Sequence, residues 1–484
     1  MTSMVARPLP IGTGSTGTRT ESDSLGEIEV PAEHYWGAQT QRSLSHFSIG
    51  DDHMPKAVYH AYGHVKKAAA LVNASAGRLD ETLAEAIVAA ADEVIAGKLD
   101  AEFPLYVWQT GSGTQSNMNV NEVIANRASQ LLGGALGTKH PVHPNDHVNM
   151  GQSSNDTFPT AMHIATLLAI QNGTLPQLNA LADAVWKKAV EWVDVVKIGR
   201  THLQDATPLT VGQEWSGWAT QIRDAVARLE QSLAGLHALA AGGTAVGTGI
   251  NAPDGFGEAI AAKLAELTGL PLETAPNKFA AQGSLDAMVA TSAGLRGVAV
   301  ALMKVANDMR WLASGPRAGL HELRLPANEP GSSIMPGKVN PTQQEAMVMV
   351  CLQVIGEDSI VAAAGSQGNF ELNAMRPIII NNVLHSARIL GDASDKLRTF
   401  SVEGTQLDKA KVSDYVGRSL MLVTALSPHI GYDKASAIAH KADDEGTTLR
   451  EVALALGVSA ADFDRIVDPK TMVGDPERDL GLAK

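Results

Sequence analysis

The chain has 484 residues, of which 44% are hydrophobic, 4% aromatic and 19% charged, and its formal net charge is −14 at pH 7. Nucleic acids require a basic face on their protein partners, so this acidic balance argues against nucleic-acid binding. The single cysteine, Cys351, excludes an intrachain disulfide and favours a reducing compartment, for which we expect the cytoplasm.

Two features of the chain bear on targeting and on membranes. Residues 1–18 are rich in Gly, Ser, Thr and Pro and lack the apolar core of a signal peptide. Arg7 and the absence of acids before Glu21 are features of transit peptides, but a disordered tail is the favoured interpretation. The apolar runs elsewhere are interrupted by charges or are too short to span a bilayer, so we expect no membrane partner.

The first part of the chain predicts helices separated by polar segments. Residues 55–97 have an Ala-rich helical pattern, and a polar segment follows at 110–121. A short helix is expected to end near Leu132, and a connector rich in Pro, Gly and His at 133–151 closes the first domain. Pro176 is expected to end or kink the helix in which it lies.

Long helical patterns follow, and they predict a bundle. One apolar stripe has the spacing of three and four that one helix face requires, through Trp215, Trp218, Ile222, Val226, Leu229, Leu233 and Leu236. A second stripe forms a heptad seam, through Leu295, Val298, Leu302, Val305, Met309 and Leu312. Residues 346–364 are apolar on nearly every side, so we expect that helix to be buried among others. Because one chain cannot easily bury so many seams, we infer an oligomer with a helical core.

Four polar segments rich in Ser, Thr and Asn stand beside these patterns. They read Thr-Gly-Ser-Gly-Thr-Gln-Ser-Asn-Met-Asn-Val-Asn at 110–121, Gly-Gln-Ser-Ser-Asn-Asp-Thr at 151–157, Gly-Arg-Thr-His-Leu-Gln-Asp-Ala at 199–206 and Gly-Ser-Ser-Ile-Met-Pro-Gly-Lys-Val-Asn at 331–340. The last segment combines hydroxyls, a cation and an amide around a Gly/Pro turn, which suits a small planar anion. Four such segments converging from different helices predict a carboxylate-binding site.

In this order the four segments resemble the fumarase/aspartase superfamily of lyases, and the resemblance to class II fumarases is close from about Arg19 to about Gly474. The Gly-Ser-Ser-x-Met-Pro-x-Lys-x-Asn run is the signature of the superfamily. Three features select the fumarase branch. His202 stands where aspartases usually have Gln, the 110–121 segment has the fumarase form, and Tyr-Trp-Gly-Ala-Gln-Thr-Gln-Arg-Ser at 35–43 is similar to the opening of this branch.

The resemblance implies a mainly α, three-domain fold with a central five-helix bundle in each subunit. Four subunits would form a homotetramer with a twenty-helix core, and each active site would draw on three of them. On this chain we expect a disordered tail at 1–18, an N-terminal lyase domain at 19–152, a long-helix domain at 153–409 and a small helical domain at 410–484.

The activity implied is the reversible trans addition of water to fumarate, giving (S)-malate, as in the tricarboxylic acid cycle, with no cofactor and no metal ion. A proton is removed beside a carboxylate, and charge accumulates as an aci-carboxylate that needs donors around it. Lys338 and Asn340 fit that requirement. The resemblance assigns the base to Ser332; physical grounds alone would not, because a free serine hydroxyl ionises only at very high pH.

His202 is the candidate for protonating the departing hydroxide or activating the incoming water, since histidines ordinarily titrate near neutral pH. The resemblance implies that Glu345 orients this imidazole. The other predicted contacts hold the substrate carboxylates, mainly through neutral donors. The substrate-binding set is Ser112, Gly113, Thr114, Ser153, Ser154, Asn155, Thr201, Ser333, Lys338, Val339 and Asn340.

A second dicarboxylate site, outside the catalytic cleft, is implied at a His-Pro-Asn-Asp turn made of His143, Pro144, Asn145 and Asp146. His140 and His147 flank this turn and allow a metal-site alternative, but neither a Cys partner nor a metal-binding motif accompanies them. Cys351 lies in an apolar run, so we expect a buried structural thiol.

Two rival functions stay open. An ammonia-lyase acting on aspartate is disfavoured by His202 and by the wording of the 110–121 segment. A non-catalytic scaffold, of the kind recruited from this superfamily as lens proteins, could lose Ser332, Lys338 or His202 without loss of packing, and all three are present. The expected partners are therefore small dicarboxylates and further copies of the chain.

Overall fold

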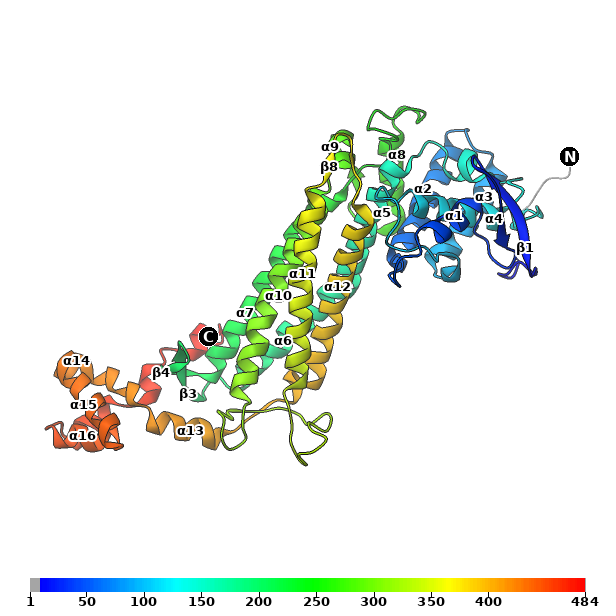
Figure 1. Ribbon diagram of the computed structural model, residues 1–484. Helices are drawn as coiled ribbons and strands as arrows, with labels where there is room; N and C mark the ends of the chain where they lie inside the picture. Colours follow the sequence, from blue (N-terminus) through cyan, green and yellow to red (C-terminus); the bar gives the residue numbers. More distant parts are fainter. Residues whose placement is uncertain (1–8, 484) are drawn as a thin grey trace. The chain divides into compact units, whose positions relative to one another are not determined.

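The computed structural model describes residues 9–483 and divides the chain into two compact units. Unit 1 comprises Met1–Thr174, Arg228–Gly297 and Gln353–Ile389, and unit 2 comprises Leu175–Ala227, Val298–Leu352 and Leu390–Lys484. Four long helices contribute residues to both units (Figure 1): α7 (Val211–Ser232), α10 (Asp286–Leu312), α11 (Thr342–Gly365) and α12 (Arg376–Phe400). The chain is mainly α-helical, as predicted.

Unit 1 is built from closely packed, Ala-rich helices beside an antiparallel hairpin of β1 (Thr18–Asp23) and β2 (Gly26–Pro31). Its other helices are α1 (Ala38–His46), α2 (Lys56–Ser75), α3 (Glu81–Ile95), α4 (Thr114–Leu131), α5 (Ser154–Ala169), α8 (Phe256–Thr268) and α9 (Lys278–Gly283), with short turns at η1 (Asp100–Glu102), η2 (Pro144–Val148), η3 (Ile170–Thr174) and η4 (Leu233–His237). Two-residue strands pair as β5 (Ala238–Leu239) with β6 (Glu273–Thr274) and β8 (Gly368–Asn369) with β9 (Leu372–Asn373). Helices α2 and α3 approach so closely that a Cβ on Gly63 would lie 2.7 Å from Ile95 Cγ1.

Two helix boundaries in unit 1 differ from the sequence prediction. The stretch predicted as helical at 55–97 forms two helices, because Gly77 turns the chain with φ 67° and Asp80 caps α3. The short helix expected to end near Leu132 is longer, since α4 begins at Thr114 and includes most of the 110–121 segment. The Ser and Asn side chains of that segment usually favour caps and turns, and their composition concealed the helix.

The disordered tail predicted for residues 1–18 falls partly on residues 1–8, which lie outside the described residues. The segment that follows is fixed to α4. The Arg127 guanidinium donates to Leu9 O at 2.7 Å and to Pro10 O at 3.2 Å. Gln130 donates to Gly12 O at 2.8 Å. Residues 9–12 are therefore held by hydrogen bonds rather than disordered.

Unit 2 contains helix α6 (Leu175–Glu191), the hairpin of β3 (Val196–Thr201) and β4 (Gln204–Thr210), and the short pair β7 (Leu323–Arg324) and β10 (Gln406–Leu407). Its last part is made of η5 (Val402–Gly404), α13 (Lys409–Arg418), η6 (Leu420–Leu426), α14 (Ser427–Ile430), α15 (Tyr432–Glu445), α16 (Leu449–Ala455), α17 (Ala460–Ile466), η7 (Pro469–Met472) and α18 (Pro476–Asp479). Pro176 is the second residue of α6, and the π-helical segment η3 lies directly before it, so the α-helical geometry is interrupted at this proline.

Both predicted apolar stripes are buried, which confirms the helical periodicity. The heptad seam of α10 has exposed fractions between 0% and 6%, and the stripe that runs from Trp215 to Leu236 has fractions between 0% and 4%. Leu233 and Leu236, the last two members of the stripe that begins at Trp215, lie in η4, because α7 ends at Ser232.

Helix α11, expected to be buried among other helices, is only partly covered by its own chain. Met349 and Leu352 are 64% and 58% exposed, and Ile360 is 42% exposed. By length and composition α10 and α11 could each cross a membrane, with 44% and 33% of their most apolar windows buried. The prediction that every apolar run is too short or too charged to span a bilayer was therefore wrong for these two helices. A helix that packs against helices of another subunit meets the same criterion, and a heptad seam is typical of packing on helices.

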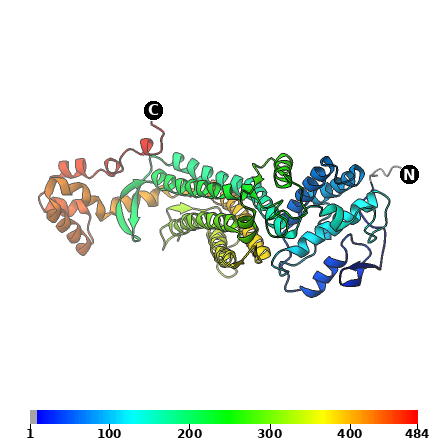
Figure 2. The ribbon, with the colours of Figure 1, turned by 90° about the horizontal axis from the view of Figure 1, so that it is seen from above.

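The last part of unit 2 has a hydrophobic core of its own. Leu426, Ile438 and Ala453 are fully buried in a cluster contributed by η6, α15, α16 and α17, short helices that lie together in Figure 2. This core is independent of the long helices, although the division of the chain into three domains at 152 and 409 stays a prediction.

We expect Ile438→Ala to reduce the protection of amides in residues 420–472 by about 2 to 5 kcal/mol, because the substitution leaves a cavity in this core. Hydrogen exchange measured by mass spectrometry checks this region by region. His440→Ala, an exposed change on the same helix, should alter protection by less than about 0.5 kcal/mol. An equal loss of protection across the whole chain would contradict a separate C-terminal core.

Candidate functional site

The first group of candidate residues lies at the N-terminus of α4 in unit 1. Gly113 has φ 76°, and a Cβ there would lie 2.1 Å from Phe158 Cδ2, so only glycine fits this turn. Thr114 is the first helical residue, and its hydroxyl lies 2.7 Å from that of Ser112. The first N–H groups of a helix have no acceptor within the helix, so this turn can receive a carboxylate.

The N-terminus of α5 is a second such turn. The Ser153 hydroxyl accepts the N–H of Asn155 at 3.2 Å, while the Asp156 carboxylate accepts the N–H of Ser153 at 3.0 Å. This capping box fixes the entry of the helix. Ser154 is 8% exposed, and Asn155 donates its side-chain amide to Ala245 O at 2.7 Å. The helix dipole favours an anion beside these residues.

The two helix N-termini are joined by buried residues that the sequence analysis did not identify. The Asn117 amide donates to Ser154 Oγ at 3.0 Å, and Lys66 Nζ donates to Asn117 Oδ1 at 2.7 Å. Arg376 Nη1 lies 3.4 Å from Ser154 O. A lysine in the middle of the Ala-rich pattern of α2 was the available signal, since a buried ammonium requires acceptors around it.

The signature loop at 331–340 lies between β7 and α11 in unit 2. It is closed on itself, because Gly331 N donates to Lys338 O at 3.0 Å and the Asn340 amide donates to Gly331 O at 2.7 Å. Ser332 Oγ accepts the N–H groups of Ile334 and Met335 at 3.2 and 3.0 Å. Two amide donors on this oxygen favour its ionised form over the neutral hydroxyl.

His202 lies at the tip of the β3–β4 hairpin in unit 2. Thr201 pairs with Gln204, so His202 and Leu203 form a two-residue turn with φ 56° and 64°. Neither is glycine, and a leucine with positive φ is rare. Such strain persists where the surroundings impose it, often at functional positions. The imidazole of His202 is exposed and accessible to a ligand.

Buried ion pairs fix the base of this hairpin. Lys197 Nζ lies 2.7 Å from Glu214 Oε1 and 2.9 Å from Glu322 Oε2, and Arg200 lies 2.6 Å from Glu322 Oε1. The Lys197 and Glu322 side chains are only 2% and 3% exposed. The Arg200 guanidinium also lies 5.6 Å from the ring centroid of Tyr415. These charges attach β3 to α7, to β7 and to α13.

Some of the predicted pairings do not form within one chain. Among residues 9–483, no hydrogen bond or ion pair joins Glu345 to His202, or Lys338 to Ser332. Glu345 is half-buried in the first turn of α11, and Lys338 is exposed. The roles assigned to these four residues, and to Ser333 and Val339 in the same loop, therefore stay predictions.

The His-Pro-Asn-Asp turn is the N-terminal part of η2 in unit 1. His143 Nδ1 accepts the N–H groups of Asn145 and Asp146, both at 3.1 Å. The imidazole therefore orders the turn through its Nδ1 atom, which also lies 3.4 Å from Asp146 Oδ2.

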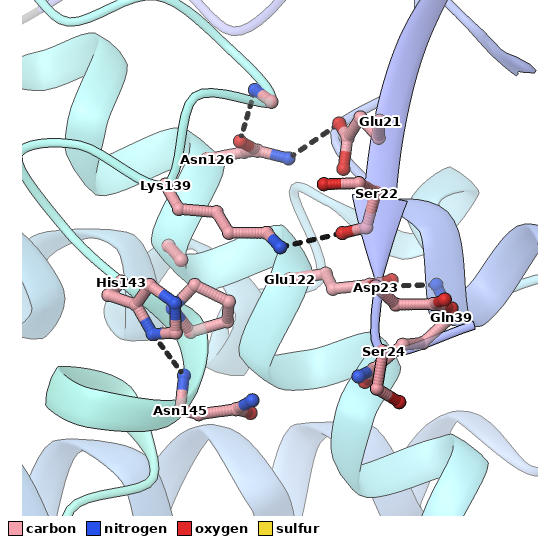
Figure 3. Close-up of a pocket in the computed structure, with 13 residues that line it drawn as sticks. Glu21, Ser22, Asp23, Ser24, Gln39, Glu122, Asn126, Lys139, His143 and Asn145 are labelled. Carbon is pink, nitrogen blue, oxygen red and sulfur yellow. Dashed lines mark hydrogen bonds between the residues drawn. The ribbon is translucent and has the colours of Figure 1, made fainter. Parts of the chain in front are cut away.

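A cavity of 160 Å³ lies beside this turn, and its polar lining includes three carboxylic acids and one lysine (Figure 3). Glu21 and Asp23 come from β1 and Glu122 comes from α4, whereas Lys139 donates to Ser22 O at 2.6 Å. Burial raises the pKa of Glu122 to about 7, although four hydrogen bonds from Thr40, Gln39 and Gly37 oppose that shift. Nothing in this lining tests the second dicarboxylate site, which stays a prediction.

The candidate metal ligands have other partners. His147 Nδ1 accepts the backbone N–H of His143 at 2.9 Å. Within residues 9–483, no three His, Cys, Asp or Glu side chains are arranged as metal ligands. Burial raises the pKa of the Cys351 thiol to about 12, which fits a structural thiol and not a nucleophile.

The chain is similar to known proteins along most of its length. A lyase family matches residues 26–356, and a fumarase C C-terminus family matches residues 422–474. A class II fumarate hydratase of Methanosarcina acetivorans is 73% identical over 98% of both chains, and one of Thermosynechococcus vestitus is 59% identical over 95% of this chain and 99% of its own. The crystal structure of a class II fumarase from Schistosoma mansoni matches with a TM-score of 0.93 and 46% identity, over 95% of this chain and 99% of that one.

We expect Glu322→Gln to lower the free energy of unfolding by about 3 kcal/mol, because it removes one partner of a buried ion-pair network. Urea unfolding followed by tryptophan fluorescence, to which Trp215 and Trp218 in α7 contribute, measures this change. The control is Glu191→Gln, which breaks an exposed pair with Lys188 and should cost less than about 1 kcal/mol. Equal costs for the two variants would show that the network does not hold the hairpin.

Proposed function

The chain belongs to the class II fumarate hydratases of the fumarase/aspartase superfamily, and we propose that Ser332 is the base of its reversible hydration of fumarate. One observation carries this assignment. Ser332 Oγ, in an accessible loop, accepts two backbone N–H groups at 3.2 and 3.0 Å. The same two donors that order the loop stabilise negative charge on this oxygen, which compensates for the weak acidity of a serine hydroxyl.

In the direction of dehydration, Ser332 removes the proton from the carbon beside one carboxylate of (S)-malate. The electron pair moves into that carboxylate and forms the aci-carboxylate. The carbon–oxygen bond on the neighbouring carbon then breaks, the double bond of fumarate forms, and hydroxide departs as water after gaining a proton. Lys338 supplies positive charge to the aci-carboxylate, and Asn340 supports it by holding the loop closed through Gly331 O at 2.7 Å.

The proton for the departing hydroxide comes from His202 on the opposite face of the substrate. The strained turn carries this imidazole at an exposed tip, while the buried ion pairs of Lys197 and Glu322 fix the strand below it. Glu345 orients the ring from the first turn of α11. Because acid and base act on opposite faces, addition of water is trans.

Substrate carboxylates bind at the N-termini of α4 and α5. Ser112, Gly113 and Thr114 serve one turn, and Ser153, Ser154 and Asn155 serve the other, with Thr201, Ser333 and Val339 completing the contacts. Neutral hydroxyls and amides supply most of the donors, so the dianion is oriented without excessive affinity for the product. The reaction needs no cofactor and no metal ion.

The site is completed by three subunits of a homotetramer. Two observations support this proposal. The apolar helix α11 leaves Met349 and Leu352 more than half exposed. Covering such apolar side chains with helices of other subunits removes them from water and stabilises the assembly. Glu345 and His202 also lack a mutual hydrogen bond within one chain, among the residues described. The tetramer is expected in the cytoplasm, and the His143 turn is expected to bind a further dicarboxylate.

We expect wild-type protein to form fumarate from (S)-malate but not from aspartate, and Ser332→Ala to reduce malate turnover at least about 10³-fold by removing the base. Fumarate is followed by its ultraviolet absorbance. Ser366→Ala, at the exposed end of α11, serves as the control and should keep the wild-type rate. Sedimentation must show the same oligomer for all three proteins. Fumarate formed from aspartate alone would instead identify an ammonia-lyase.

We expect His202→Asn to slow turnover at least about 100-fold and to remove one limb of the pH–rate profile. Asparagine tolerates positive φ, so this variant keeps the turn while removing the proton donor. Leu203→Asn tests the same turn with the imidazole intact and should remain within threefold of wild type. A wild-type pH profile in His202→Asn would exclude the imidazole from the proton transfers.

A further inference from the structure

The chain has a formal charge of −14, yet its proposed ligand is a dianion. Attraction must therefore come from positive charge placed near the binding residues, because the protein as a whole repels an anion. Two buried cations in unit 1 contact Ser154 or its immediate partner, and neither has a carboxylate within hydrogen-bond distance.

Lys66 is the first of these cations. Its side chain is fully buried on α2, and Nζ donates to three neutral acceptors: Asn117 Oδ1 at 2.7 Å, Asn149 Oδ1 at 3.0 Å and Gln152 Oε1 at 3.0 Å. Asn117 in turn donates to Ser154 Oγ at 3.0 Å. With its oxygen occupied by this donor, the Ser154 hydroxyl is free to donate its own proton to a ligand, and the chain of hydrogen bonds strengthens that donor.

Arg376, at the start of α12, is the second cation. It is fully buried, and its guanidinium donates to two backbone carbonyls, Gln282 O at 3.0 Å and Ser154 O at 3.4 Å. Its Nε has no partner among the described residues. Burial lowers the pKa of this guanidinium to about 10, so it remains charged at neutral pH. Backbone carbonyls and one free N–H leave most of its charge uncompensated.

Asp156 is the carboxylate whose charge raises the pKa of both cations, and its hydrogen bonds go to other partners. It accepts the N–H groups of Ser153 at 3.0 Å and of Gly242 and Thr244, both at 2.9 Å. Burial raises the pKa of Asp156, and these three bonds and Lys66 oppose that shift. Two cations around one shared carboxylate leave net positive charge beneath the N-terminus of α5.

We propose that Lys66 and Arg376 are specificity-determining residues, whose buried charges make the Ser154 subsite select a carboxylate and take up a proton when one binds. The proposal rests on the dicarboxylate site of the proposed function, but it concerns binding and can be measured without turnover. Lys66 is the group that gains the proton, because an anion beside Ser154 favours its ammonium form.

The surroundings of Lys66 make this titration possible near neutral pH. Burial lowers the pKa of Lys66 to about 7, and Asp156 on α5 opposes that shift. The other titratable group that faces it is Tyr62, whose ring centroid lies 5.5 Å from Nζ on the same helix. From α4 and from the segment around η2 it meets only amides among the described residues. An anion beside Ser154 raises the pKa of Lys66 again, so binding takes up a proton in this range and affinity for a dicarboxylate falls as pH rises.

The first experiment measures binding of succinate, a saturated dicarboxylate, to the wild-type protein by calorimetry at about pH 8. Comparing two buffers that differ in ionisation enthalpy gives the number of protons taken up per site. We expect a net uptake of protons in wild type and in the control variant Lys67→Met. In the wild type, Lys67 Nζ pairs with Asp92 Oδ1 at 2.7 Å on the adjacent helix α3. Lys66→Met should bind without proton uptake. Absence of uptake in wild type, or its persistence in Lys66→Met, would overturn the role of Lys66.

The second experiment separates charge from structure at Arg376. We expect Arg376→Met to raise the KM for malate and the inhibition constant of succinate about tenfold, with a smaller change in kcat. Arg376→Lys, which keeps the charge but not the fork of donors, should recover to within threefold of wild type. Arg388→Met, an exposed change on the same helix, is the control. Equal impairment of the Met and Lys variants would mean that Arg376 only holds two carbonyls, and the charge proposal would fail.

These outcomes separate the proposal from the function on which it rests. Wild-type protein that binds succinate with proton uptake but does not turn over malate would contradict the hydratase and leave the two cations with their assigned role. If wild type turns over malate but the substitutions at Lys66 and Arg376 have no charge-dependent effect, the hydratase stands and the role of the two cations is contradicted. If Arg376→Met does not fold, the comparison of proton uptake between wild type and Lys66→Met still tests whether a buried charge at the Ser154 subsite responds to the ligand.

Discussion

Negative charge held inside an acidic protein is the constraint on which this structure depends. The ligand brings two charges and the reaction adds a third, while the chain itself carries −14. The groups that we propose for this task are local donors: the N-termini of α4 and α5, two amides on Ser332 Oγ, and the buried cations Lys66 and Arg376. In a low-dielectric setting such groups act strongly at short range, and the surface charge matters little.

The chemical groups lie on exposed segments, whereas the elements that hold them are buried. His202 is at a strained hairpin tip, but the strand below it carries Lys197, paired with Glu322 at 2.9 Å. Ser332 lies in an accessible loop that Asn340 closes through Gly331. In the homotetramer that we propose, this arrangement brings the reactive groups to substrate and to neighbouring chains while their backbones stay fixed. The same proposal accounts for the apolar residues of α11 that one chain leaves exposed.

The long helices and the polar segments beside them were predictable from the sequence. The apolar stripes of α7 and α10 follow from local periodicity, and all their members are buried. The polar segments were recognisable because few folds need so many hydroxyls beside Gly turns. Other features were not predictable, since they depend on contacts distant along the chain. The start of α4 at Thr114 is determined by packing against Phe158, and the roles of Lys66 and Arg376 by what surrounds them. The apolar pattern of α11 predicts burial among helices, but a sequence pattern cannot say whether those helices belong to the same chain or to another subunit.

A crystal structure of the protein with a bound dicarboxylate would test the central claim most directly. The account predicts one carboxylate within hydrogen-bond distance of Ser154 and the first N–H groups of α5. It also predicts that the reacting carbon lies next to Ser332 Oγ contributed by another subunit. A ligand bound remote from both, or a site complete within a single subunit, would contradict it.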